Sequence, residues 1–152
     1  MMELRKVDRD NWEQALRLKV MKEQEKLVPS VAVSLAKVYI KPDGDDVEYL
    51  PFSIYVNDRM VGFIMHAYVQ KTENMYWING FLIDEQQQGK GYGKQALNEM
   101  ISWIETKFPH SKETRLTVNR ENKHAIDLYE KLDYVPTGEE YDGEIVYRRK
   151  RV

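Results

Sequence analysis

The sequence predicts an α/β protein of the α+β kind, with a mixed, mostly antiparallel central sheet of about six to seven strands flanked by about four helices. Three observations predict this class. Apolar residues alternate with period two through 52–69, and they recur at intervals of three and four after a glycine-rich loop at 89–93; a short apolar strand at 116–118 follows. A strand, helix and strand in this order form a parallel pair, so we expect a gap between its two splayed strands.

Composition limits the possibilities before any motif is considered. At 152 residues, with 42% hydrophobic and 32% charged side chains, the chain suits a single domain over 1–152. No apolar run approaches the roughly 20 residues of a membrane span, and residues 1–6 lack a signal-like apolar segment, so we expect a cytoplasmic protein without a membrane partner. The absence of cysteine removes an acyl-cysteine intermediate, and His66, His110 and His124 lack ligand spacing, so no metal is expected.

Charge is spread unevenly along the chain. The net charge of −2 argues against nucleic acid as a partner, because nucleic-acid-binding domains usually carry a basic face. Acidic residues gather in two segments, from Asp43 to Glu48 and from Glu139 to Glu144. Two solvated loops are one interpretation. The other is a pair of acidic rims that attract a cationic substrate.

The first fifty residues predict one strand and two helices ahead of the main sheet. Residues 4–7 suit a short strand, and Asp10 or Asn11 can cap the first helix. Its apolar side would consist of Trp12, Leu16 and Val20 or Met21. A second short helix is expected over 33–37, and the turn signal Lys-Pro-Asp-Gly follows at 41–44.

The remaining strands are predicted from alternation and turn residues. A hairpin spans 52–56 and 60–69 around Asn57-Asp58, and a third strand over 75–83 leads into the glycine loop. After the glycine-capped helix, 116–118 returns parallel to its partner strand. Strands over 134–139 and 144–149, joined at Asp142-Gly143, complete the sheet.

The glycine loop carries the strongest functional signal. Gly89, Gly91 and Gly93 precede a helix whose apolar face consists of Ala96, Leu97, Met100, Ile101, Ile104 and Phe108. A loop at a helix N-terminus offers unpaired amides to a phosphate, and Lys90 and Lys94 add positive charge. The spacing does not fit a P-loop or a dinucleotide fingerprint. Gln88, two residues, Gly91, one residue and Gly93 instead resembles the coenzyme A loop of the GNAT superfamily of N-acetyltransferases; the alternative is a turn that merely caps the helix.

A second motif follows at the spacing that this family shows. Asn122 and Tyr129 are seven residues apart and share one helical stripe with Ala125, so they can face the same ligand. The pair resembles the second half of the GNAT cofactor site. Each residue alone suits an ordinary role, Asn122 as a helix cap and Tyr129 as a core residue. Asp133 stands where the family usually has glycine, which puts the local geometry of that helix end in doubt.

The resemblance implies an acetyl-CoA-dependent N-acetyltransferase. The residues that it assigns to the cofactor are Phe81, Leu82, Ile83, Gln88, Gly89, Lys90, Gly91, Tyr92, Gly93, Lys94 and Asn122. An amine would attack the acetyl thioester directly in a ternary complex, and Tyr129 matches the family's general acid. The base stays open, because no carboxylate or histidine lies on 77–83; a water chain at Asn79 or Tyr76, or a loop acid, is equally suitable.

The acceptor is predicted less sharply. The stretch 76–84, with the hairpin over 55–65, is similar to bacterial spermine/spermidine acetyltransferases within the superfamily. Aromatic residues could line a channel for an alkyl ammonium chain, with Asn79 beside it, or could belong to the sheet core. These aromatics are Tyr39, Tyr55, Tyr68 and Trp77. Acetylation of a protein N-terminus, a lysine or an aminoglycoside remains an alternative, as does a non-catalytic acyl-CoA sensor. A homodimer is compatible with the resemblance.

Overall fold

A computed structural model describes residues 1–152 and contains one seven-stranded sheet in the order β1-β2-β3-β4-β5-β7-β6. Every neighbouring pair is antiparallel except β4 and β5. The predicted mixed sheet is therefore confirmed. The strands are β1 (Met2–Lys6), β2 (Glu48–Val56), β3 (Arg59–Tyr68), β4 (Tyr76–Ile83), β5 (Glu113–Val118), β6 (Val135–Tyr141) and β7 (Glu144–Lys150).

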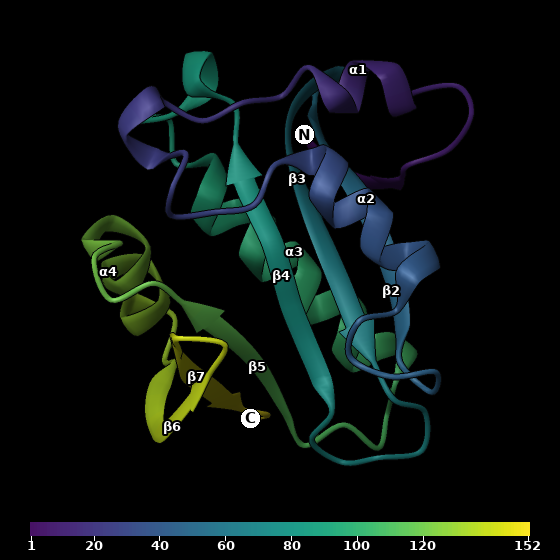
Figure 1. The fold of residues 1–152 in the computed structure, drawn as a ribbon, viewed down its shortest axis with the longest axis vertical. Coiled ribbons are helices and arrows are strands. Elements are labelled where there is room, and N and C mark those ends of the chain that lie inside the picture. The colour runs from purple at the N-terminus through teal and green to yellow at the C-terminus, as the bar shows by residue number, and fades with distance from the viewer.

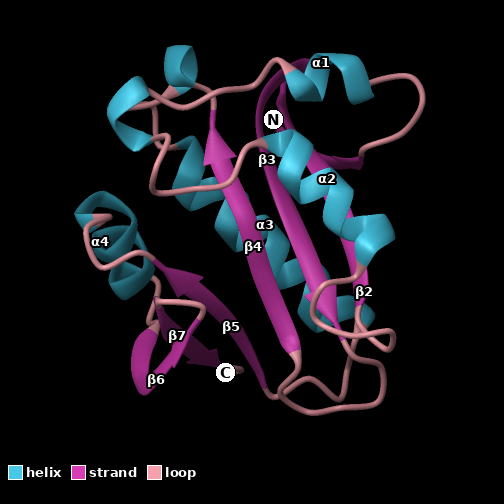
Figure 2. Ribbon diagram, in the orientation of Figure 1, coloured by secondary structure: helices cyan, strands magenta, loops and turns pink.

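Helices cover both faces of the sheet, as Figure 1 shows with α1 and α2 in front and α3 behind. Figure 2 separates these two helical layers from the strands by colour. The four α-helices are α1 (Trp12–Leu16), α2 (Val31–Ile40), α3 (Tyr92–Lys107) and α4 (Lys123–Lys131). Two short 3₁₀ helices, η1 (Lys22–Gln24) and η2 (Glu85–Gln87), lie in the connections. None of the helices is both long and apolar enough to cross a membrane.

The main core lies between the sheet, α3 and α4. The predicted apolar face of α3 is confirmed, since its members from Ala96 to Ile104 are buried against β-strand residues such as Ile78 and Leu116. A second, smaller core lies under α1 and α2, where Ala15 and Val31 are buried. Burial of apolar side chains on both faces stabilises the sheet by the hydrophobic effect.

A bulge in β4 reverses the side-chain alternation of that strand. Phe63 lies opposite Leu82 and Met65 opposite Asn79, so the two residues Gly80 and Phe81 together face one residue of β3. Gly80 has φ 61°, and a Cβ there would meet Ser34 Oγ of α2 at 2.6 Å. Glycine therefore allows both the left-handed backbone and the close approach of α2. The consequence is that Asn79 and Leu82 share a face although they are three residues apart.

The parallel strands β4 and β5 separate soon after they meet. Their ladder comprises only Trp77 with Arg115 and Ile78 with Leu116. Figure 1 shows the two strands as a V that opens toward their C-terminal ends. The predicted splayed pair is confirmed. The strands begin to separate after Ile78, just before the bulge in β4.

The first predicted helix is shorter than expected, and its predicted apolar side is wrong. Helix α1 ends at Leu16, and Trp12 and Leu16 are 45% and 40% exposed. Hydrogen bonds to a distant segment compete with the helix after that point: Lys19 N donates to Asp84 Oδ1 at 3.1 Å, and Lys19 O accepts from Glu85 N at 2.8 Å. The chain therefore runs as a strap along the end of β4.

Turn positions follow the predicted chemistry. Asn57 and Asp58 have φ 49° and 66°, and the last hairpin turns at Asp142 and Gly143 with φ 51° and 82°. Pairs of positive φ values are the signature of tight hairpin turns. Asp133 adopts φ 70° at the end of α4, so it takes the left-handed conformation for which glycine is usual, and the helix end keeps its form.

Candidate active site

The edge of β4 that faces β5 presents backbone groups without a strand partner. Asp84 N donates to Val61 O at 2.8 Å, so by the alternation of an antiparallel ladder Ile83 turns its N–H and C=O away from β3. β5 has already diverged there, because its pairing with β4 ends at Ile78 and Leu116. An extended ligand arm can therefore pair with this edge like an added strand.

The glycine loop leaves open space and unpaired amides at the start of α3. Gly89 and Gly91 have φ 79° and 81°, and a Cβ on either would meet no atom within 4 Å. Gly91 is the N-cap residue, and no side chain caps the helix. The first amides of α3, from Tyr92 to Lys94, thus have no intrahelical acceptor and point toward the open side. This arrangement suits a bound phosphate group.

Gln88 hydrogen-bonds the glycine loop to the end of β4 and to η1, and does not face the open side. Its Nε2 donates to Ile83 O at 3.0 Å and to Gln24 Oε1 at 2.9 Å, and Gln24 Nε2 donates back to Gln88 Oε1 at 3.3 Å. Lys90 Nζ donates to Gln87 Oε1 at 3.0 Å, and Lys94 is exposed. The role of Gln24 was not predicted, because no local pattern links η1 to a loop 64 residues away.

Asn122 precedes α4 as its N-cap residue and Tyr129 lies on α4, and the two side chains have different surroundings. Asn122 Oδ1 accepts from Ala125 N at 3.3 Å, so it caps α4. Tyr129 is 8% exposed within the main core. Burial raises its pKa above the ordinary value, with smaller contributions from Tyr134 and Glu144, so the phenol stays protonated at neutral pH.

The tyrosine hydroxyls around α4 differ in their partners. Tyr134 Oη lies 2.7 Å from Thr114 Oγ1, and Tyr147 Oη donates to a carboxylate oxygen of Glu130 at 3.2 Å. Tyr129 has no such partner in the protein. A buried phenol with a free proton can donate to a ligand atom, so its geometry is that of a proton donor.

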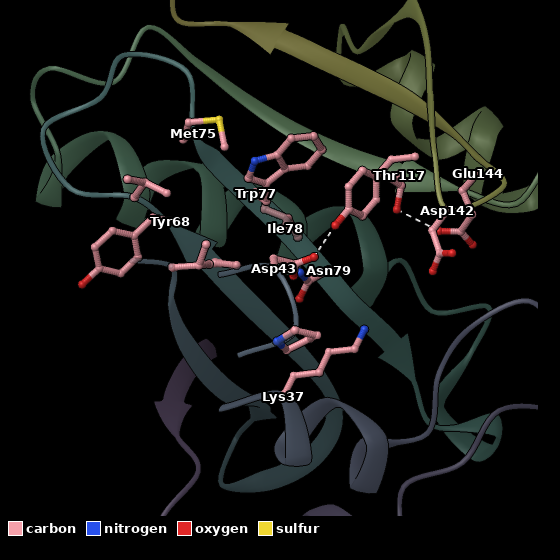
Figure 3. Close-up of a pocket in the computed structure, with 15 residues that line it drawn as sticks. Lys37, Asp43, Tyr68, Met75, Trp77, Ile78, Asn79, Thr117, Asp142 and Glu144 are labelled. Atoms are coloured by element: carbon pink, nitrogen blue, oxygen red, sulfur yellow. Dashed lines mark hydrogen bonds between the residues drawn. The ribbon is translucent and has the colours of Figure 1, made fainter. Parts of the chain in front are cut away.

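On the α2 side of the sheet a cavity of about 640 Å³ opens beside the splayed strands. Figure 3 shows Trp77 and Asn79 of β4 in one wall, Thr117 of β5 beside them, and Lys37 of α2 opposite. Asn79 Oδ1 is buried and has no hydrogen-bond partner. A buried acceptor without a donor is costly, so this atom favours a ligand that brings an N–H or O–H.

The two acidic segments meet at the mouth of this cavity. Tyr141, at the tip of the last hairpin, donates to Asp43 Oδ1 across 98 residues of sequence, and Tyr49 donates to Asp43 Oδ2. The hydrogen bond to Asp43 raises the pKa of Tyr141, and burial followed by the same carboxylate raises the pKa of Tyr49. With Asp142 and Glu144, the cavity is lined by three carboxylates and one ammonium, that of Lys37.

The structure separates the predicted aromatic channel residues. Trp77 lies in the cavity wall with its ring 6.4 Å from that of Tyr141. Tyr39 is 89% exposed and outside the wall, and Tyr55 is buried beneath the guanidinium of Arg5. Tyr68 borders the cavity, but in Figure 3 its ring points away from it. Trp77 and Asn79 are thus brought together, whereas Tyr39 is not.

His66 supports the cavity wall from the opposite face of the sheet. Its Nδ1 lies 3.0 Å from Trp77 O, and its ring stacks on Tyr68 and Tyr76. Burial lowers the pKa of His66 to about 4, so the ring is neutral and donates its Nδ1 proton to that carbonyl. No group of three or more carboxylate, histidine or cysteine side chains is arranged to hold a metal ion.

A free strand edge that leads into a glycine loop at a helix N-terminus, with a phenol and a polar cavity beside it, suits an extended ligand that carries a phosphate group. Comparison with known proteins makes this specific. The chain belongs to the acetyltransferase (GNAT) family, whose model matches residues 10–134. It is an acetyltransferase, and acetyl-CoA is its acetyl donor.

Relatives and solved structures agree with this assignment. Over 104 residues the chain is 34% identical to the spermine/spermidine N(1)-acetyltransferase of Bacillus subtilis strain 168, which covers 64% of this chain and 68% of that protein. An acetyltransferase of Bacillus subtilis in complex with CoA has a TM-score of 0.69 at 13% identity, over 99% and 98% of the two chains. An aminoglycoside acetyltransferase with coenzyme A has a TM-score of 0.77 at 15% identity, over 99% and 95%. These two structures establish the fold.

Proposed function

We propose that this acetyltransferase acts on a primary amine of a small polycation, a polyamine such as spermidine or spermine. The observation that carries the proposal is the convergence of both acidic segments on a cavity lined by Asp43, Asp142 and Glu144, with Lys37 as its one cation. Carboxylates gathered in a concave wall raise the local concentration of a cationic ligand. The similarity to a spermine/spermidine acetyltransferase points to the same class of acceptor.

The cofactor is assigned to the loop side of the sheet. The pyrophosphate would lie on the amides from Gly89 to Lys94, and the pantetheine arm would pair with the β4 edge from Phe81 to Ile83. The open space around both left-handed glycines supports this assignment. Acetyl-CoA supplies an activated acetyl group on sulfur. Asn122 accepts from Ala125 N and so holds the start of α4, which borders the site, in place.

The acceptor is assigned to the α2 side. A reacting amine would lie near the unpartnered Asn79 Oδ1, where β4 and β5 begin to separate. The remaining ammonium groups would lie toward Asp43 and Asp142 at the mouth, and the aliphatic chain between them would lie against the ring of Trp77. One cavity then binds both ends of a flexible polycation.

Proton transfer is divided between the two sides. Most primary amines have a pKa near that of lysine, about 10.4, so a proton must leave nitrogen before it can attack. The leaving thiolate is helped by a donor, and Tyr129, whose phenol stays protonated at neutral pH and has no hydrogen-bond partner in the protein, takes that role. No cysteine is present, so direct attack in a ternary complex is the proposed route.

An amine panel tests the acceptor class. Release of free thiol from acetyl-CoA is measured with spermidine, spermine, an aminoglycoside, an N-terminal peptide and a simple monoamine. The polyamines are expected to have a kcat/KM at least tenfold above the others. Higher activity with the peptide or the aminoglycoside would reject the polyamine assignment, and binding of acetyl-CoA without turnover of any amine would favour the non-catalytic sensor.

The charge argument has its own test in Asp43→Asn. Asparagine is nearly the same size and removes one negative charge from the mouth; its amide oxygen can still accept from one of the two phenols, Tyr49 or Tyr141, and its NH2 can donate to the other hydroxyl. The KM for spermidine is expected to rise about fivefold, equivalent to about 1 kcal/mol, with kcat unchanged. Asp45→Asn, in the same loop but outside the cavity, is the matched control and is expected to leave KM unchanged. Equal effects of the two variants would show that the charges of this loop attract the substrate only through the net charge of the protein, and not through contact in the cavity.

A further inference from the structure

The carboxylate of Glu144 lies in the cavity wall beside the end of β5. Glu144 begins β7 and lines the cavity together with Thr117, whose Oγ1 donates to Glu144 Oε1 at 2.8 Å (Figure 3). The next residue, Ile145, pairs with Val118 at the end of β5. Since the β4–β5 ladder stops two residues earlier, at Leu116, Glu144 lies at the opening of the V.

The surroundings leave this carboxylate available to a ligand. Its one hydrogen bond fixes one oxygen, and no lysine or arginine pairs with it, in contrast to Glu140, which forms an ion pair with Arg120. The other cavity acids are placed differently. Asp43 already accepts from two phenols, and Asp142 is exposed at the turn.

Two further features point to a reacting nitrogen at this place. Asn79 of β4 and Thr117 of β5 line the same cavity, and the buried Asn79 Oδ1 lacks a donor. From the other direction, the charge of Glu144 acts on the phenol of Tyr129, so the proposed proton donor lies within electrostatic reach of the carboxylate. A nitrogen held by Asn79 would thus have an acceptor of protons and a donor of protons nearby.

We propose that Glu144 is the general base that deprotonates the acceptor amine, directly or through one water molecule, with Thr117 as the residue that positions its carboxylate. The ammonium nitrogen loses its first proton to Glu144. The neutral amine then forms the N–C bond to the acetyl carbon as the C–S bond breaks, and sulfur takes the phenolic proton of Tyr129. The nitrogen gives up its second proton as the amide forms, so one proton is released net once Tyr129 and Glu144 have returned to their starting states.

The titratable groups around Glu144 come from four elements. Tyr141 and Asp142 lie in its own hairpin, Lys37 on α2, Asp43 in the loop before β2, and Tyr129 on α4. All of them remain in the variant Glu144→Gln, whose amide oxygen can still accept from Thr117. The substitution therefore removes the basic group with little change in shape, and Glu140→Gln in the same hairpin serves as the control for the lost charge.

The test is the pH dependence of kcat/KM, measured with whichever amine in the panel is the best substrate of the wild type, so that it does not depend on a polyamine acceptor. At pH 7, Glu144→Gln is expected to lose about 10²-fold. The loss should shrink steadily toward pH 9.5, because solvent then supplies the neutral amine. Glu140→Gln should stay within twofold of wild type throughout, and calorimetry should show acetyl-CoA affinity within twofold for both variants.

Each result decides the proposal. A loss that is the same at every pH would mean that Glu144 acts through charge or packing, and no loss at all would place the base elsewhere; both overturn the assignment. Glu144→Asp is expected to recover part of the activity at pH 7, which a role in packing alone does not predict. Loss of acetyl-CoA affinity in Glu144→Gln would show damage to the site as a whole and would also reject the role of a base.

Discussion

The two sides of the proposed active site are built in different ways. The cofactor side, along the edge of β4 and the loop before α3, presents main-chain groups set by glycines a few residues apart. The acceptor side consists of side chains from α2, three loops and five strands, and its mouth joins Asp43 to Tyr141 across 98 residues. A main-chain site is encoded locally, whereas a side-chain site depends on the completed fold.

This difference explains why the two sides carry different information. Backbone amides can recognise a phosphate and an amide-bearing arm. Acetyl-CoA has both features, whichever acceptor the enzyme uses. The acceptor side can change its specificity by single side chains without disturbing the loop. Cofactor identity therefore follows from the family, whereas the acceptor depends on the charges and on the unpartnered Asn79 in this cavity.

The largest effect on catalysis is expected from substitution of Tyr129, the proposed proton donor. Tyr129→Phe keeps the ring and its packing but removes the proton that the departing sulfur would take. The kcat is expected to fall about 10²-fold, with acetyl-CoA affinity within a few-fold of wild type. Because the pKa of Tyr129 is raised, the wild-type rate should show no decline from ionisation of this phenol up to pH 10. Steady-state kinetics and calorimetry measure both quantities.

A neighbouring tyrosine supplies the control. Tyr134 is buried with its ring 6.0 Å from that of Tyr129, and its hydroxyl is paired with Thr114. Tyr134→Phe is expected to cost about 1 kcal/mol of stability, since Thr114 loses a partner, but to leave kcat within twofold. If Tyr129→Phe behaves like Tyr134→Phe, Tyr129 is only a core residue and the sulfur takes its proton from solvent.

The sequence predicted the order of elements because their signals are local. The hairpin turn at Asn57-Asp58, the apolar face of α3 and the spacing of Asn122 and Tyr129 all lie within a few residues or turns. The end of α1 at Leu16 was missed, because the competing partner of Lys19 lies at Asp84, far along the chain. Tyr39 is exposed and lies outside the cavity wall, and the local sequence around it does not say which wall its side chain faces.

One missed feature did have a signal. An isolated glycine within a strand indicates a bulge or a close approach, and Gly80 shows both. Recognising it would have placed Asn79 and Leu82 on one face and would have aimed Asn79 at the acceptor cavity. The meeting of Asp43 with Tyr141 has no comparable signal, since a charge cluster alone does not say what it faces.

A second prediction concerns the stability of the acceptor wall, which His66 supports through Trp77 O. Burial raises the pKa of Tyr129 and of Tyr134, so neither phenol changes its charge in acid. His66 differs, since its pKa is about 4 in the fold and about 6.5 in the unfolded chain. The unfolded state binds more protons between these values, so this contribution to stability is complete above pH 6.5 and is lost as the pH falls toward 4.

At pH 5 the expected loss is about 2 kcal/mol relative to pH 7, measured by urea unfolding at each pH. His66→Phe should be about 1 kcal/mol less stable than wild type at pH 7, because Trp77 O loses its donor, yet it should lose less stability between pH 7 and pH 5. If the free energy of unfolding falls equally with pH in the two proteins, His66 is not the cause of the loss of stability in acid.

The smallest expected effect isolates the cofactor side. Gly91 has φ 81° at the N-cap of α3, with open space where a Cβ would lie, so Gly91→Val places a branched side chain where the pyrophosphate is expected and strains the loop. The Kd for acetyl-CoA is expected to rise tenfold or more, about 1.4 kcal/mol, as measured by calorimetry. Gly138→Val is the matched control, because Gly138 has φ 89° and equally open surroundings but lies in β6, outside the loop. Backbone strain alone should lower the stability of both variants. Only Gly91→Val should weaken acetyl-CoA binding, and unchanged affinity in a folded Gly91→Val protein would remove the loop from the site and with it the contrast between the two sides.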